Sequence, residues 1–167
     1  MSKPKVAIIM GSDSDFNTLK PCIKMLKKFE IEPDVNVISA HRTPENAEKF
    51  AKSAEENGIE VIIAAAGKAA HLAGVLAAFT TVPVIGIPIK SSTMDGLDSL
   101  LSVVQMPKGI PVATVAIDGA DNAGILAAQI LSLKYDYIKP MLKEFKQDMR
   151  SEVEAKNEKI KQEAAQL

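Results

Sequence analysis

The chain has 167 residues, a length typical of one domain, and its hydrophobic content of 47% is ordinary for a globular protein. Its 20 basic and 21 acidic residues nearly cancel, which argues against a nucleic-acid-binding surface. Its apolar runs, such as residues 61–66, are far shorter than the roughly 20 residues that cross a membrane. We therefore expect a soluble protein with neither a nucleic-acid nor a membrane partner.

Three further features of composition bear on compartment and assembly. The single Cys22 cannot form an internal disulfide, and the residues before the first apolar run are too few for a signal peptide. Both observations favour the cytoplasm. Aromatic residues make up only 4% of the chain while alanine is abundant, and this pattern favours burial between subunits, so we expect a homo-oligomer.

The expected elements alternate between strand and helix along the chain. In the first half they are a strand at residues 5–10, a helix with apolar spacing at Leu19, Ile23, Leu26 and Phe29, a strand at 35–39, a helix from Pro44 to about 57, and a strand at 61–66. In the second half they are a helix at 67–79, a strand at 82–87, a helix at 97–104, a strand at 111–117 and a helix at 121–133.

This alternation predicts an α/β protein with a three-layer, flavodoxin-like fold. We expect a five-stranded parallel sheet of order 2-1-3-4-5 with helices on both faces. The residues from Tyr135 onward form a polar tail, rich in Lys and Glu, in which Pro140 breaks or starts a helix. We expect a single domain over residues 1–167, with a core at about 4–133 and a helical tail at about 135–167.

Polar residues follow the first expected strand, at the edge where parallel sheets bind ligands. Ser12 and Ser14 offer hydroxyl donors beside a helix N-terminus, which can bind an anion. The alternative is that they only cap the helix. Two nearby acids, Asp13 and Asp15, would repel a phosphate, so one of them better suits sugar hydroxyls.

Both histidines, and the one arginine outside the tail, fall in two neighbouring strand-end loops. His41 and Arg42 follow the second strand, and His71 follows the third. The planar guanidinium suits a phosphate or a carboxylate, and an imidazole can give and take a proton near neutral pH. Each residue alone is more often structural, but their coincidence at one edge favours a site. Two histidines and one cysteine match no metal-ligand spacing, so we expect no metal.

Four ordered motifs connect these loops with a known family. MGSDSD, SAHRTP, AGKAAHLAG and DGLDSLLSVVQMPKGIPVATV resemble the 5-(carboxyamino)imidazole ribonucleotide mutases over about residues 6–131. The resemblance implies conversion of 5-carboxyamino-1-(5-phosphoribosyl)imidazole to 5-amino-1-(5-phosphoribosyl)imidazole-4-carboxylate in purine biosynthesis, by loss and recapture of carbon dioxide without a cofactor. It also implies a flavodoxin-like subunit in a homo-octamer whose sites lie between subunits.

The resemblance also implies roles for individual residues. His41 corresponds to the general acid–base residue and His71 to a second histidine of the mutase class, and we count both as catalytic. The ten implied substrate-binding residues are Ser12, Ser14 and Arg42 for the phosphate, Asp15 for the ribose, and Ser39, Ala66, Gly67, Lys68, Ala69 and Leu72 around the base and carboxylate.

Lys68 departs from the mutase motif, which commonly has glycine or another small or apolar residue there, and Ala73 stands where proline is usual. A related carboxylase class, which adds carbon dioxide directly to the aminoimidazole, has a basic residue near Lys68 but lacks the histidine equivalent to His71. Direct carboxylation is therefore the alternative activity. A receiver-like signalling domain and a flavin-binding electron carrier are alternatives on the same fold, although residues 64–67 lack the acceptor aspartate of a receiver.

Overall fold

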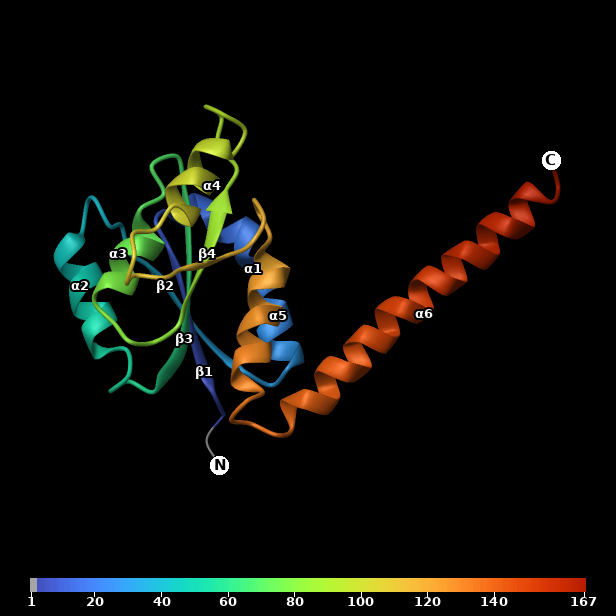
Figure 1. The fold of residues 1–167 in the computed structure, drawn as a ribbon, viewed down its shortest axis with the longest axis horizontal. Coiled ribbons are helices and arrows are strands. Elements are labelled where there is room, and N and C mark those ends of the chain that lie inside the picture. The colour runs from blue at the N-terminus through green and yellow to red at the C-terminus, as the bar shows by residue number, and fades with distance from the viewer. Residues whose placement is uncertain (1–2) are drawn as a thin grey trace.

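The computed structural model describes residues 3–167 as a parallel sheet between two helical layers, with one long helix projecting from the body (Figure 1). The sheet has the strand order β2-β1-β3-β4-β5, which confirms the predicted topology. Its strands are β1 (Lys5–Met10), β2 (Glu32–Val37), β3 (Ile59–Gly67), β4 (Val84–Ile89) and β5 (Ala113–Thr114).

Helices cover both faces of this sheet. They are α1 (Phe16–Lys28), which follows the short 3-10 turn η1 (Asp13–Asp15), then α2 (Pro44–Ser53), α3 (Leu72–Ala78), α4 (Leu97–Val104), α5 (Ala120–Leu131) and α6 (Ile138–Ala164). In Figure 1, α2 and α3 lie on one side of the strands and α1 and α5 on the other. The α/β fold with three layers is therefore confirmed.

The central strands are buried on both faces because apolar side chains alternate between two cores. Ile8 and Ile63 face the α1 and α5 layer, and Ile9 and Ile62 face the α2 and α3 layer. Each such side chain contributes roughly 1.5–3 kcal/mol when fully buried. Cys22 lies in the first of these cores, where burial raises the pKa of its thiol to about 12, so the thiol is unreactive near neutral pH.

The parallel register brings the carboxyl ends of four strands to one edge. Met10, the last residue of β1, pairs with Val37 on β2 and Ala65 on β3, and Gly67 at the end of β3 pairs with Ile89 on β4. The loops after these strands therefore begin side by side.

Both edge strands differ from the prediction. The second strand begins at Glu32 rather than residue 35 and ends at Val37 rather than residue 39. An edge strand has one free side, so it tolerates Pro33 and polar residues that argue against a central strand. The fifth strand is only Ala113–Thr114, because its ladder with β4 comprises two pairs.

The predicted helix at residues 67–79 begins later, at Leu72. Gly67 still belongs to β3, and two short hydrogen bonds close the loop that follows. The N–H of Ala70 donates to the carbonyl of Lys68, and the N–H of His71 donates to the carbonyl of Ala69, both at 2.9 Å. His71 therefore occupies the N-cap of α3. The predicted second helix is shorter too, since α2 ends at Ser53.

Helix α6 begins on the body and leaves it. Pro140 lies in its first turn, where backbone N–H groups have no acceptor within the helix. The N–H that proline lacks therefore costs no hydrogen bond, and the proline starts the helix rather than breaking it. Ile138 is buried, and the Phe145 ring packs edge-on against Phe29 with centroids 5.8 Å apart. Residues 146–167 are all exposed, as the projecting arm in Figure 1 illustrates. Within residues 3–167, no helix has the length and apolar character needed to span a membrane.

Candidate active site

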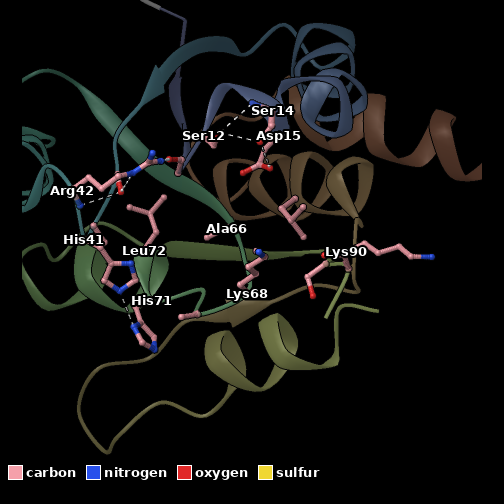
Figure 2. Close-up of a pocket in the computed structure, with 18 residues that line it drawn as sticks. Ser12, Ser14, Asp15, His41, Arg42, Ala66, Lys68, His71, Leu72 and Lys90 are labelled. Carbon is pink, nitrogen blue, oxygen red and sulfur yellow. Dashed lines mark hydrogen bonds between the residues drawn. The ribbon is translucent and has the colours of Figure 1, made fainter. Parts of the chain in front are cut away.

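An open cavity of about 630 Å³ lies at the carboxyl edge of the sheet, formed by the loops after β1 to β4 (Figure 2). This volume is within the range of roughly 300–1,000 Å³ for small-molecule sites. Every residue predicted for the site lines it: Ser12, Ser14, Asp15, Ser39, His41, Arg42, Ala66, Gly67, Lys68, Ala69, His71 and Leu72. The structure thus brings the predicted residues together, and their individual roles stay predictions.

The loop after β1 is shaped by its two serines. The hydroxyl oxygen of Ser12 accepts hydrogen bonds from the Ser14 N–H at 3.3 Å and from the Ser14 hydroxyl at 2.9 Å. Ser12 is therefore an N-cap, but of the short turn η1 and not of a long helix. The Gly11 N–H donates to the Ala65 carbonyl at 3.1 Å, which fixes this loop to the end of β3.

Asp15 faces the cavity as a half-buried carboxyl group. Burial is the main reason that its pKa is raised above the usual value, and the charges of Asp118 and Asp13 raise it further, against a hydrogen bond from Ser14 that lowers it. Asp15, with these acidic neighbours, is therefore itself unsuited to contact a phosphate. A carboxylate there can instead accept hydrogen bonds from hydroxyl groups.

Arg42 bridges the loops after β1 and β2. Its Nη2 donates to the Gly11 carbonyl at 3.1 Å and its Nε to the Ser39 hydroxyl at 3.4 Å, so the guanidinium has a fixed orientation at the cavity. Thr43 stands at the N-cap of α2, but its hydroxyl makes no capping bond. That hydroxyl instead donates to the Ser39 carbonyl and accepts from the Ser39 N–H, both at 3.0 Å.

The two histidine side chains meet within the cavity, as the dashed line in Figure 2 marks. Nε2 of His41 lies 3.0 Å from Nδ1 of His71, and the rings are inclined by 76° with centroids 5.2 Å apart. Either ring can donate this hydrogen bond, depending on its tautomer. Both side chains are exposed, so a ligand in the cavity can reach the pair.

The loop after β3 carries an unusual backbone conformation at Lys68. Gly67 has no positive φ, and a Cβ added to it would meet the Ile89 carbonyl oxygen at an ordinary 3.5 Å. The positive φ of 55° belongs to Lys68 instead.

Six further residues line the cavity without having been predicted for the site: Gly11, Ala40, Ile89, Lys90, Ser91 and Ser92. The last four lie at or just after the end of β4, so the strand-end rule that found the other loops also applies to them. Within residues 3–167, no three potential metal ligands from His, Cys, Asp and Glu gather in one place.

Fold and cavity together define a class: a flavodoxin-like α/β protein with a small-molecule site at the carboxyl edge of its sheet. The sequence narrows this class further. Residues 5–152 match the AIR carboxylase family, and the chain belongs to that family.

Three relatives illustrate this membership. The chain is 63% identical over 147 residues to N5-carboxyaminoimidazole ribonucleotide mutase of Pyrococcus abyssi, covering 88% of this chain and 84% of that protein. It is 54% identical over 159 residues to phosphoribosylaminoimidazole carboxylase of Candida glabrata, covering 95% of this chain but 28% of that protein. The crystal structure of Treponema denticola PurE superposes with a TM-score of 0.87 at 31% identity, covering 95% of this chain and 99% of that one.

Proposed function

We propose that this chain is a mutase of purine biosynthesis that converts 5-carboxyamino-1-(5-phosphoribosyl)imidazole to 5-amino-1-(5-phosphoribosyl)imidazole-4-carboxylate. The observation that carries the proposal is the contact of His41 with His71 in the same cavity as Arg42. Relatives with 63% and 56% identity that are named as N5-carboxyaminoimidazole ribonucleotide mutases support it.

The substrate has a phosphate at one end and a carboxylated imidazole at the other. In the proposed pose, the Arg42 guanidinium and the Ser12 and Ser14 hydroxyls bind the phosphate, because charge-assisted hydrogen bonds favour an anion there. Asp15 accepts from the ribose hydroxyls. The imidazole lies toward the histidine pair, among the side chains and backbone of Ser39, Ala66, Gly67, Lys68, Ala69 and Leu72.

His41 is the proposed general acid and base. As an imidazolium it donates a proton to the exocyclic nitrogen while the bond from that nitrogen to the carboxyl carbon breaks and carbon dioxide is released. Carbon 4 of the aminoimidazole then attacks carbon dioxide, and neutral His41 removes the proton from carbon 4. One proton is given and one is regained, so the reaction is an isomerisation that changes no oxidation state and uses no cofactor in this proposal.

His71 is proposed to hold His41 in orientation and to share its proton. The 3.0 Å contact gives a proton on one ring a direct path to the other. Small residues that line the same cavity, such as Ala66 and Ala69, leave room for the imidazole of the substrate.

Direct carboxylation of the aminoimidazole is the second candidate, favoured by the cation at Lys68 and by the name of the Candida relative. The test is to supply the carboxyamino substrate without bicarbonate and, separately, the aminoimidazole ribonucleotide with bicarbonate. Rapid turnover of the first supports the mutase. Turnover of the second alone supports the carboxylase and overturns our proposal.

We also propose that the chain works as a single-domain subunit of a cytoplasmic homo-oligomer, an octamer. Exposed apolar side chains support assembly: Leu97, Leu101 and Val104 on α4, and Val153 and Ile160 on α6. Sedimentation equilibrium tests this point. The mass of eight chains is expected, and a monomer at micromolar concentration would contradict it.

A further inference from the structure

Lys68 combines three properties that set it apart from the other lysines. It lines the cavity, it directly follows the last residue of β3, and its backbone has a φ of 55°. A residue with a Cβ pays roughly 1–2 kcal/mol for this left-handed conformation, whereas glycine adopts it freely. Folding stability therefore does not favour a lysine here, and residues in such conformations cluster at functional sites.

Among residues 3–167, the ammonium group of Lys68 forms no ion pair, in contrast to that of Lys90, which also lines the cavity. Lys90 pairs with Asp95 at 2.9 Å, and Figure 2 shows its side chain pointing away from the other labelled residues. Within residues 3–167, no carboxylate lies within 4.0 Å of the Lys68 ammonium. In the same view Lys68 stands among the labelled residues, between Ala66 and Lys90.

Lys68 and Arg42 approach the cavity from different strands. Arg42 follows β2 and Lys68 follows β3, with β1 between them. Neighbouring strands are about 4.8 Å apart, so the two loops start roughly 10 Å from each other. The cavity therefore holds two cationic side chains on separate loops, and a ligand with two anionic groups matches them better than a single anion.

The loop after β3 also ties Lys68 to the histidine pair. The Lys68 carbonyl accepts a hydrogen bond from the Ala70 N–H at 2.9 Å, and the Ala69 carbonyl accepts one from the His71 N–H at the same distance. The Ser102 hydroxyl on α4 also lies 3.5 Å from the Lys68 carbonyl oxygen, while it donates to the Asp98 carbonyl at 2.7 Å. The backbone of Lys68 thus belongs to the same loop as His71, whereas Arg42 is on the phosphate side of the proposed pose.

We propose that Lys68 recognises the carboxyl group of the ribonucleotide and makes the site selective for carboxylated over uncarboxylated imidazoles; this inference rests on the proposed function. An ammonium attracts both the carbamate of the substrate and the carboxylate of the product. It attracts neutral carbon dioxide much less, so it strengthens binding of the two end states and not the intermediate step. Its loss should raise KM without lowering kcat.

The test compares the full-length wild type with Lys68→Met, which keeps a long unbranched side chain and the cost of the left-handed backbone but removes the charge. Affinities are measured by calorimetry for the 4-carboxylate product and for the aminoimidazole ribonucleotide that lacks the carboxyl group. We expect Lys68→Met to weaken binding of the carboxylated ligand about 10- to 100-fold, as expected for loss of a charged hydrogen bond. Binding of the uncarboxylated ligand should change by about twofold or less, since it makes no such bond.

Two matched variants sharpen the result. Lys68→Arg keeps the charge and should restore most of the selectivity. Lys52→Met removes a lysine on α2 that pairs with Glu48 at 2.6 Å and does not line the cavity, so it should leave both affinities unchanged. Equal losses for the two ligands, or no loss for either, would overturn the inference. A wild-type protein that binds neither ribonucleotide would instead overturn the proposed function, so the two failures are distinguishable.

Discussion

The amino and carboxyl edges of the sheet both carry polar clusters. The clusters differ in whether their polar groups pair with each other or face a cavity. At the amino edge, one oxygen of the Glu60 carboxylate accepts from the Tyr135 hydroxyl and the other from the Lys134 ammonium, each at 2.6 Å. At the carboxyl edge, Lys68 and the histidine pair turn toward an open cavity. A polar cluster whose groups hydrogen-bond to one another stabilises the fold, whereas a cluster with unpaired groups facing a cavity can bind a ligand.

The largest expected effect is at the carboxyl edge, on catalysis. His41→Asn should lower turnover by about 10²- to 10⁴-fold, because it removes the proton transfer, while nucleotide affinity stays within about tenfold. Steady-state kinetics and a binding titration measure the two effects. His71→Asn serves as the comparison and should retain more turnover with an altered pH profile. Near-normal turnover of His41→Asn would remove His41 from the mechanism.

The next effect concerns binding at the same edge. Arg42→Ala should weaken substrate affinity by about 10- to 100-fold, because the fixed guanidinium is the proposed phosphate ligand. The matched control is Arg150→Ala, since Arg150 pairs with Glu154 on the exposed arm at 2.7 Å. If Arg42→Ala binds the nucleotide as tightly as that control, the phosphate lies elsewhere.

A smaller effect is expected at the amino edge, on stability alone. Tyr135→Phe removes the hydrogen bond to Glu60 and should lower the free energy of unfolding by about 1 kcal/mol with unchanged turnover. Tyr137→Phe is the control, because its hydroxyl makes only a 3.3 Å contact with the Glu30 carbonyl. Urea unfolding measures the difference. Lost turnover in folded Tyr135→Phe would mean that the two edges are not independent.

The smallest effect is a pH dependence at Asp15, whose pKa is raised mainly by burial. The folded chain holds this proton more tightly than the unfolded chain does. The resulting stability is therefore present below the ordinary Asp pKa of 3.8 and is lost as pH rises through the folded pKa.

Asp15→Asn cannot ionise, so at pH 7 it should be slightly more stable than the wild type, by less than about 1 kcal/mol since solvent screens a half-exposed group. Urea unfolding at pH 7 and at acidic pH should show the advantage shrinking as pH falls. An advantage that grows toward acidic pH would contradict the assigned direction.

The regular elements of the fold follow from local sequence patterns. Buried runs such as residues 5–10 and the helix over residues 97–104 occur where apolar periodicity predicts them. The errors arise where tertiary contacts override local preference. Ala69 and Ala70 favour helix by propensity, yet pairing with Ile89 keeps Gly67 in β3, and the short hydrogen bonds of the following loop delay the helix until Leu72.

The site was predictable as a set of residues, because all of its loops follow parallel strands at one edge. Its finer geometry was not. The 3.0 Å contact between His41 and His71 joins side chains 30 positions apart, and nothing in sequence spacing reports their relative orientation. The left-handed backbone of Lys68 is equally hidden, because the adjacent glycine is the residue that normally supplies such a conformation.

The central claim is that the cavity holds the ribonucleotide with its imidazole at the histidine pair. A crystal structure of the chain with the aminoimidazole ribonucleotide tests it most directly. The account predicts the phosphate at Ser12 and Arg42 and the imidazole beside His41. A nucleotide bound away from this cavity, or with its phosphate at the histidines, would contradict the account.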